Sequence, residues 1–307
     1  MSKLITGVLP ALITPMDEHG NILVDSAKPL IDWYEKEKAD GLYMLGWTGE
    51  GMYLSVQQRK TWAEAVLKAN NNRMPIFVHV GYNENLDDSV ELARHAEEHG
   101  AYAVASVGIS PRSTLADNVA YFKRISEAAP KTPFYIYWTS NGEMLTGGER
   151  VDPEELLEAM KAVPTFKGIK FTDNNFYILE RFKKYNPHIN ILTGADNLVI
   201  CSDIMGADGN IGALQAITCY DFKVLLEKMK EGNYKEAREI QYRTNEIAEA
   251  YSVRNIGTIP GIKIVMERVY NIPAGYCSPT SPYLPKVTDE ALIESYLKVY
   301  RDNIIKR

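Results

Sequence analysis

One lysine of this chain stands in the middle of an apolar segment, residues 166–173, which lies between two amphipathic helix candidates. A run of that length between helices is typical of a buried parallel strand. Alternation along the strand places Lys170 on one face together with Gly168 and Thr172. Burial lowers the pKa of a lysine, and the neutral amine can then attack a carbonyl carbon. The alternative is a lysine near the strand end whose ammonium reaches solvent or a carboxylate.

Two further groups that could take part in a reaction lie at the ends of other predicted strands. Tyr137 lies near the end of the run 134–138, and a glycine-rich turn at 46–51 follows another apolar run. The glycines allow a tight turn, and its Thr48 hydroxyl and backbone N–H groups suit a carboxylate. An amine, a phenol for proton transfer and a carboxylate-binding turn together favour a site that handles a keto acid. Taken singly, the tyrosine could be a packing residue and the turn an ordinary barrel loop.

These groups need a scaffold that brings the ends of different strands together. Strand and helix candidates alternate eight times within about 230 residues. The strand candidates are 7–15, 41–46, 75–81, 101–107, 133–138, 166–173, 189–194 and 209–214. This alternation predicts an α/β fold with a parallel sheet, closed as a (β/α)8 TIM barrel, with an open doubly wound sheet as the alternative. In such a barrel the active site lies at the carboxyl ends of the strands, where all three groups would meet.

Three more helices are expected after the eighth unit, at 234–252, 261–270 and 289–305. No low-complexity linker and no break in composition separates them from the barrel. We therefore expect residues 1–232 to form the catalytic barrel and residues 233–307 to form a helical extension packed on it.

Composition narrows the classes of protein that this chain can belong to. A net charge of −6 gives no reason to expect nucleic acid or an anionic membrane as a partner. No apolar run approaches the roughly 20 residues of a membrane span, and the start lacks a signal-peptide core, so we expect a cytoplasmic protein. His95 and His99 have the helical i, i+4 spacing of some metal ligands, but their acidic neighbours favour a solvated helix face, and we expect no metal.

The order of these pieces resembles the N-acetylneuraminate lyase and dihydrodipicolinate synthase family of Schiff-base (class I) aldolases. The sequence Gly-Trp-Thr-Gly-Glu at 46–50 is similar to the family's Gly-Ser/Thr-Thr-Gly-Glu turn. Tyr137 matches the tyrosine after the fifth strand, 168–173 the lysine segment, and 206–212 the glycine-rich lead-in to the eighth strand. The resemblance covers the barrel and continues into the C-terminal helices.

The resemblance implies a role for each matched residue. Lys170 would form the Schiff base with pyruvate or a pyruvate-derived substrate, and Tyr137 would move protons. Trp47, Thr48 and, at the eighth strand, Ile211 and Gly212 would hold the substrate carboxylate or line its pocket. The protonated imine would serve as the electron sink, so no metal or organic cofactor is implied. A small-molecule substrate and a homotetramer are also implied.

Within the family, the lysine segment is most similar to that of the sialic acid lyases, which also have a threonine at the position of Thr172. That branch binds sugar hydroxyls with a Gly-x-Asp-Glu segment, which here reads Gly194-Ala195-Asp196-Asn197. Asn197 therefore replaces a glutamate, and Ala213 stands where a serine is usual. The synthase branch has an arginine a few residues after the tyrosine, and 138–143 contains none.

Two other departures concern the centre of the site. Trp47 replaces a small hydroxyl residue, and its indole would either narrow the pocket or turn outward. The run 108–113 lacks the second relay tyrosine that many members carry. We expect a lyase, N-acetylneuraminate lyase-like, that cleaves a 2-keto-3-deoxy sugar acid to pyruvate and an aldehyde.

Three alternatives to this function stay open. Two are enzymes, a 2-keto-3-deoxygluconate-type aldolase and a dihydrodipicolinate synthase-like enzyme. The third is a barrel that binds a keto acid or sugar acid without turnover. The presence of both Lys170 and Tyr137 argues against that third alternative, because binding alone needs neither.

Overall fold

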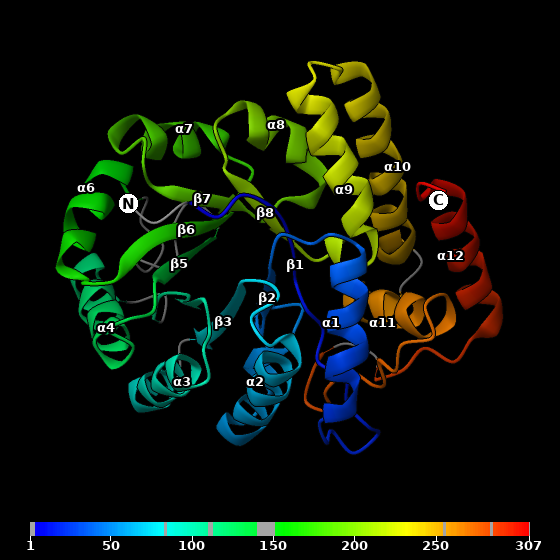
Figure 1. Cartoon of the computed structure of the whole chain (residues 1–307), viewed down its shortest axis with the longest axis horizontal. Helices are drawn as coiled ribbons and strands as arrows, with labels where there is room; N and C mark the ends of the chain where they lie inside the picture. The colour runs from blue at the N-terminus through cyan, green and yellow to red at the C-terminus, as the bar shows by residue number, and fades with distance from the viewer. Residues whose placement is uncertain are drawn as a thin grey trace.

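Eight short parallel strands form the centre of the molecule (Figure 1). The structure is a computed structural model, and it describes residues 4–82, 85–109, 113–139, 151–253, 256–282 and 285–306. The strands are β1 (Gly7–Pro10), β2 (Leu42–Met44), β3 (Ile76–Gly81), β4 (Ala103–Ser106), β5 (Phe134–Thr139), β6 (Phe166–Thr172), β7 (Asn190–Thr193) and β8 (Gly209–Gly212). Each pairs with its neighbour in chain order, and β1 pairs with β8. A bridge between Ala11 and Tyr43 closes the ring. The predicted (β/α)8 barrel is confirmed, and the doubly wound alternative is wrong.

Helices follow the strands and cover the outside of the barrel. They are α1 (Ala27–Lys36), α2 (Val56–Asn70), α3 (Leu86–Glu98), α4 (Leu115–Ala128), α6 (Pro153–Ala159), α7 (Phe176–Tyr185), α8 (Val199–Ile204) and α9 (Gln215–Lys230). Their starts follow from local chemistry, since Ser55 forms a capping box with Gln58, and Asp152 caps α6 ahead of Pro153. Helix α9 has a non-helical kink at Thr218. None of the helices among the described residues is long and apolar enough to cross a membrane.

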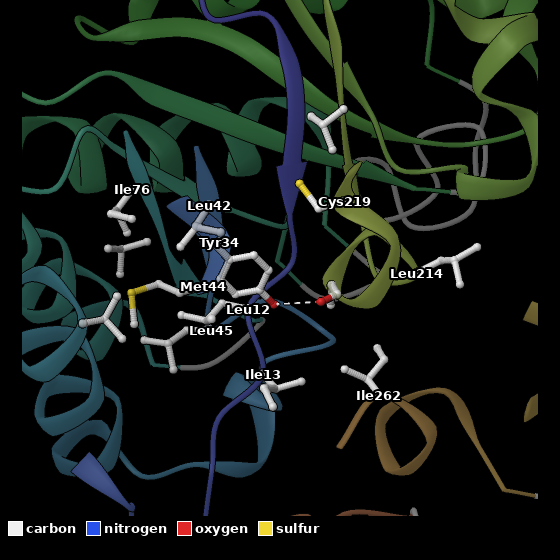
Figure 2. Packing of buried hydrophobic residues seen from close by; sticks show 14 of the residues in the cluster. Leu12, Ile13, Tyr34, Leu42, Met44, Leu45, Ile76, Leu214, Cys219 and Ile262 are labelled. Atoms are coloured by element: carbon white, nitrogen blue, oxygen red, sulfur yellow. Dashed lines mark hydrogen bonds between the residues drawn. The ribbon is translucent and has the colours of Figure 1, made fainter. Parts of the chain in front are cut away.

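Buried side chains form two layers, one inside the barrel and one between the barrel and the helices. The inner layer is made by Ile5, Leu9, Tyr43, Phe77, Ala103, Ala105, Tyr135, Leu192 and Ile211. Figure 2 shows part of the outer layer, where Tyr34 of α1 packs near Leu12 and Leu45. The Tyr34 hydroxyl donates to the carbonyl oxygen of Ala216 over 3.3 Å, which ties α1 to α9. Two-sided burial of this kind explains why the strands are nearly continuous apolar runs.

Three C-terminal helices, α10 (Tyr234–Val253), α11 (Thr258–Arg268) and α12 (Glu290–Asn303), group on one side of the barrel next to α9 and α1 (Figure 1). The Tyr300 hydroxyl of α12 donates to the carbonyl oxygen of Ile217 in α9 over 2.7 Å. Helix α11 begins at Thr258 rather than at the expected 261, with Pro260 in its first turn. The division into 1–232 and 233–307 stays a prediction.

A buried ion pair connects α11 to the turn after β2. Lys263 Nζ lies 3.0 Å from Glu50 Oε1, and both side chains are almost fully buried. Lys263 also donates to the carbonyl oxygens of Thr14 (2.8 Å) and Tyr276. The second oxygen of Glu50 accepts from the Ser278 backbone N–H over 2.8 Å. The C-terminal helices are therefore joined to the glycine-rich turn by charge and hydrogen bonding as well as by apolar packing.

We predict that Lys263→Met destabilises the protein by about 3–5 kcal/mol, because it leaves the Glu50 carboxylate buried without its cation. Unfolding in urea at neutral pH measures this change. Lys298→Met is the matched control, since Lys298 forms an exposed pair with Asp302 and its removal should change stability little. Equal effects of the two substitutions would contradict the structural role assigned to the buried pair.

Candidate active site

Lys170 lies inside the barrel, in the middle of β6. It is in register with Tyr137 of β5 and with Leu192 of β7. Its neighbours Ile169 and Phe171 point outward into the layer under the helices, as the alternation predicts. Lys170 is only 5% exposed, and no carboxylate forms an ion pair with it within the part of the chain that the structure describes. The alternative of an ammonium that reaches solvent is therefore wrong.

The Lys170 amine lies between two aromatic rings. Its Nζ atom is 4.0 Å from the ring centroid of Tyr43 and 4.0 Å from that of Tyr137. Burial lowers the pKa of Lys170 below its usual value, and interaction with Tyr137 partly offsets this effect. A larger share of the amine is therefore neutral near neutral pH than for a lysine in water, which is what a nucleophile requires.

Two tyrosines of β5 occupy different depths of the barrel. Tyr137 lies beside Lys170, and Tyr135 belongs to the apolar layer below, where its hydroxyl donates to Asn190 Oδ1 over 2.8 Å. Because the Tyr135 hydroxyl is occupied and buried, Tyr137 is the phenol that is positioned for chemistry at the amine. The expected position of Tyr137 near the end of its strand is confirmed.

The glycine-rich turn lies next to the Lys170 amine. A methyl group at Gly46 would lie 3.9 Å from Lys170 Nζ and 2.6 Å from a ring carbon of Tyr43, so the backbone approaches both. The Thr14 hydroxyl fixes the turn by donating to the carbonyl oxygen of Gly49 over 2.6 Å. Thr48 is buried, and Trp47 is 50% exposed. Of the two expected positions of Trp47, the indole turns outward and does not fill the barrel mouth.

A cavity of about 700 Å³ opens at the carboxyl ends of β6, β7 and β8. Four residues singled out in the sequence line it: Thr172, Gly194, Asp196 and Asn197. Ala213 and residues of α10 complete its wall. The Thr172 hydroxyl oxygen is buried and lacks a hydrogen-bond partner among the described residues. The cavity therefore offers a ligand an unpaired polar group, from a residue two positions after Lys170 on β6.

Asp196 is the most perturbed carboxylate of this cavity. Its Oδ2 atom accepts from the Leu214 N–H over 2.9 Å, whereas Oδ1 is buried without a hydrogen-bond partner in the described parts of the chain. A Cβ atom at Gly212 would overlap the Asp196 carboxylate, so glycine is required there. Burial raises the pKa of Asp196 to about 6, against the opposing effect of the Leu214 N–H. Ile211, one residue earlier, packs in the inner apolar layer.

Helix α10 fixes the backbone around Asp196. Gln241 donates to the Asp196 carbonyl oxygen over 3.0 Å and accepts from the Val199 N–H over 3.0 Å. Asn245 donates to the Asn197 carbonyl oxygen over 3.3 Å. The C-terminal helices thus position one wall of the cavity, a contribution that the sequence did not reveal.

Sequence reasoning missed three residues of this site. Tyr43 contacts the amine, His79 bonds to Tyr43, and Tyr251 of α10 lines the cavity. The alternation argument used for Lys170 could have found the first two, since both lie on inward positions of β2 and β3. Tyr251 has no such signal, because it comes from a helix whose docking is set by tertiary contacts.

The expected solvated face at His95 and His99 is wrong for one of the two. His95 is buried, and its Nε2 atom lies 2.8 Å from Glu64 Oε1. His99 is exposed, and its Nδ1 atom bonds to the carbonyl oxygen of His95. The sequence around 94–99 gave no sign of this, because the carboxylate that contacts His95 comes from a different helix, α2. Of the runs compared for a second tyrosine (108–113) and for an arginine (138–143), residues 110–112 and 140–143 lie outside the described residues.

The profile described as "Dihydrodipicolinate synthetase family" matches residues 4–295. The chain belongs to the dihydrodipicolinate synthetase family. The fold, the interior lysine and the glycine-rich turn agree with the resemblance drawn from the sequence.

Relatives within this family carry more specific names. An N-acetylneuraminate lyase of Xenopus tropicalis is 32% identical over 277 residues, which is 89% of each chain. An N-acetylneuraminate lyase of Mediterraneibacter gnavus is 33% identical over 246 residues, 78% of this chain and 75% of that one. Among solved structures, the wild-type Ruminococcus gnavus sialic acid aldolase has a TM-score of 0.89 at 29% identity, covering 97% and 98% of the two chains. The catalytic lysine mutant of that aldolase has a TM-score of 0.88 at 28% identity, covering 97% and 96%.

We predict that the contribution of Asp196 to the stability of the ligand-free protein depends on pH. Because its folded pKa is about 6, above the ordinary 3.8, folding favours the protonated form, and this contribution to stability is lost as pH rises through about 6. The free energy of unfolding of the wild type minus that of Asp196→Asn should therefore increase as pH falls from about 7 to about 4. Urea unfolding at several pH values measures it.

Asp32→Asn is the control of opposite sign. Hydrogen bonds from Lys28 and Arg73 lower the pKa of Asp32, so the corresponding difference should decrease as pH falls. If the free energies of unfolding of the wild type and Asp196→Asn changed in parallel with pH, burial would not raise the pKa of the Asp196 carboxylate.

Proposed function

We propose that this chain cleaves a sialic-acid-like 2-keto-3-deoxy sugar acid to pyruvate and an aldehyde, with Lys170 as the nucleophile. The chain is a Schiff-base aldolase of the carbon–carbon lyase class, by its family and its relatives. The single observation that carries the proposal is the solvent-excluded Lys170 amine, which lies against Tyr137 and close to Gly46 of the glycine-rich turn. The catalytic lysine of the Ruminococcus gnavus aldolase supports the same role for Lys170.

The reaction follows from the groups at the amine. Neutral Nζ attacks the keto carbon, and the carbinolamine hydroxyl leaves as water with a proton donated by Tyr137, which gives a protonated imine and the Tyr137 phenolate. This phenolate accepts the proton of the C4 hydroxyl, directly or through the substrate carboxylate, as the C3–C4 bond breaks. The bonding electrons move into the iminium and give an enamine, while C4 leaves as the aldehyde. Protonation at C3 and hydrolysis then release pyruvate and the free amine.

The turn at 46–51 is proposed to hold the substrate carboxylate. Its closeness to Lys170 Nζ, measured from Gly46, suits a group attached to the carbon that the amine attacks. Thr48 and the backbone N–H groups of Trp47 and Thr48 supply donors without a fixed positive charge. From the family resemblance, we propose that Ile211 and Gly212 of β8 line this carboxylate site.

The cavity beyond Lys170 is proposed to take the hydroxylated end of the sugar acid. Thr172 and Asp196 each present a buried oxygen without a hydrogen-bond partner among the described residues, and sugar hydroxyls can bond to both. Gly194 leaves room for the Thr172 side chain, because a Cβ there would overlap its hydroxyl. Asn197 and Ala213 provide fewer acceptors than the sialic acid lyase pattern, which favours 2-keto-3-deoxygluconate as the second candidate.

The iminium supplies the electron sink, so the proposed reaction requires neither a metal nor an organic cofactor. We propose a cytoplasmic homotetramer, in line with the family resemblance. Light scattering after size exclusion would measure the assembly, and a monomer at working concentration would contradict that part of the proposal.

The first prediction for this function is covalent trapping. Pyruvate with borohydride should modify Lys170 near pH 8, because its lowered pKa leaves reactive neutral amine there. Peptide mass mapping identifies the site. Lys263 is an internal control in the same sample, since it is equally buried but engaged by Glu50 and two carbonyl oxygens. An unmodified Lys170 in folded protein under saturating pyruvate would refute the Schiff-base mechanism.

The second prediction concerns the substrate. A lactate dehydrogenase-coupled assay should detect pyruvate release from N-acetylneuraminate, with a KM that Asn197→Glu or Ala213→Ser lowers by about 2- to 10-fold each. Ala248→Ser is the matched control, because Ala248 also lines the cavity but lies on α10. Preference for 2-keto-3-deoxygluconate would favour the second candidate, and condensation of pyruvate with aspartate semialdehyde would favour a synthase. Bound pyruvate without turnover of any keto acid would indicate a binding barrel.

A further inference from the structure

The Lys170 amine lies between two tyrosine rings that come from strands that are not adjacent in the barrel. Tyr43 of β2 and Tyr137 of β5 each hold their ring centroid 4.0 Å from Nζ. The two centroids are 6.4 Å apart, and the rings are nearly perpendicular, at 80°. A cation within about 6 Å of the face of an aromatic ring is attracted by its quadrupole, most strongly when water is excluded. Nζ satisfies that distance for both rings at once.

The Tyr43 ring is held in this position by a buried hydrogen bond. Its hydroxyl lies 2.6 Å from His79 Nδ1, and both side chains are inaccessible to solvent. The His79 ring packs against Tyr82 at a centroid distance of 4.1 Å, and the Tyr82 hydroxyl donates to the carbonyl oxygen of Leu45 over 2.6 Å. A chain of contacts therefore connects the Lys170 amine, through these three aromatic side chains, to Leu45, which lies between β2 and the glycine-rich turn.

The ionisable groups around Nζ give it little negative charge. Burial and the charge of Lys170 lower the pKa of His79 well below its usual value, so this imidazole is neutral, and burial raises the pKa of the Tyr43 hydroxyl. From α2, the Arg59 charge also acts on His79. From the β7 side, Asp196 acts on Lys170 only as a minor electrostatic contribution. Compensation for a positive charge at Nζ must come largely from Tyr137 and the ring faces.

We propose that the π face of Tyr43, oriented by His79, stabilises the positive charge that the Lys170 nitrogen carries as an ammonium and as an iminium. This inference rests on the proposed function, because the iminium forms only if Lys170 condenses with a keto acid. Tyr43 acts on the reacting nitrogen directly, and His79 is a positioning residue that acts through Tyr43.

The inference separates two roles that the Tyr43 side chain could have. If the ring face matters, Tyr43→Phe loses only the part that comes from the His79 hydrogen bond, as His79→Leu does, and withdrawing electron density from the ring removes the rest. If the hydroxyl relays a proton through His79, Tyr43→Phe alone abolishes the effect. The comparison of Tyr43→Phe with pentafluorophenylalanine at position 43 distinguishes these cases, because both lack the hydroxyl and they have nearly the same shape.

The experiment measures two quantities for each variant. The first is the pH midpoint of pyruvate trapping at Lys170 with cyanoborohydride, and the second is kcat for pyruvate release. Relative to Tyr43→Phe, the fluorinated ring should move the midpoint down by about one pH unit, because the ammonium is less stabilised. It should also lower kcat by about 10-fold, because the iminium is less stabilised. A general packing defect would not produce more reactive amine together with slower turnover.

Pentafluorophenylalanine at position 77 is the matched control, because Phe77 is a fully buried ring of the same inner layer, 6.2 Å from the Tyr43 ring by centroid, whereas the rings that lie against Nζ are those of Tyr43 and Tyr137. It should leave the midpoint unchanged. His79→Leu should lower kcat and shift the midpoint in the same direction as ring fluorination, and His79→Asn should restore both in part, because its side-chain oxygen can accept from Tyr43. Circular dichroism melts confirm that each variant is folded.

The outcomes separate this inference from the proposed function. If wild-type Lys170 is not trapped, the proposed function fails. If wild-type Lys170 is trapped and the fluorinated ring behaves like Tyr43→Phe, the function stands and the inference is overturned. If Tyr43→Phe itself loses turnover without any further effect of fluorination, the hydroxyl relay replaces the ring face.

Discussion

The placement of one amine in the barrel interior constrains everything around it. Water solvates an ammonium strongly, so burying Lys170 disfavours its charged form and makes it a nucleophile. The reaction nevertheless requires a cation on the same nitrogen once the imine has formed. In the barrel interior, the groups that lie against Nζ are the aromatic rings of Tyr43 and Tyr137 rather than a carboxylate. Such rings can accommodate both the neutral amine and the later cation. An adjacent carboxylate would instead hold the lysine protonated.

The barrel alone does not complete this site. Helix α11 reaches the glycine-rich turn through the buried Lys263–Glu50 pair, and α10 holds the backbone at Asp196 through Gln241. One contact supports the proposed carboxylate site and the other supports the proposed sugar site. A barrel loop is mobile when few buried contacts restrain it, so these connections explain how the short loops keep a defined geometry at the strand ends.

The sequence was most informative where one strand or helix determines the outcome. The eight-fold alternation, the inward direction of Lys170 and the depth of Tyr137 all follow from local periodicity. It was least informative where distant segments meet. The pairing of Tyr43 with His79 depends on the strand register, and the place of Tyr251 in the cavity depends on how α10 docks. Neither is encoded by spacing along the chain, so a structure was needed to find them.

The most direct measurement of the central claim is a crystal structure of the protein soaked with pyruvate. We predict continuous density from Lys170 Nζ to the keto carbon, with the carboxylate bound at Thr48 and the glycine-rich turn. We also predict that the Tyr43 and Tyr137 rings remain against the nitrogen. Pyruvate bound elsewhere, or bound in the barrel with Lys170 unmodified, would contradict this claim.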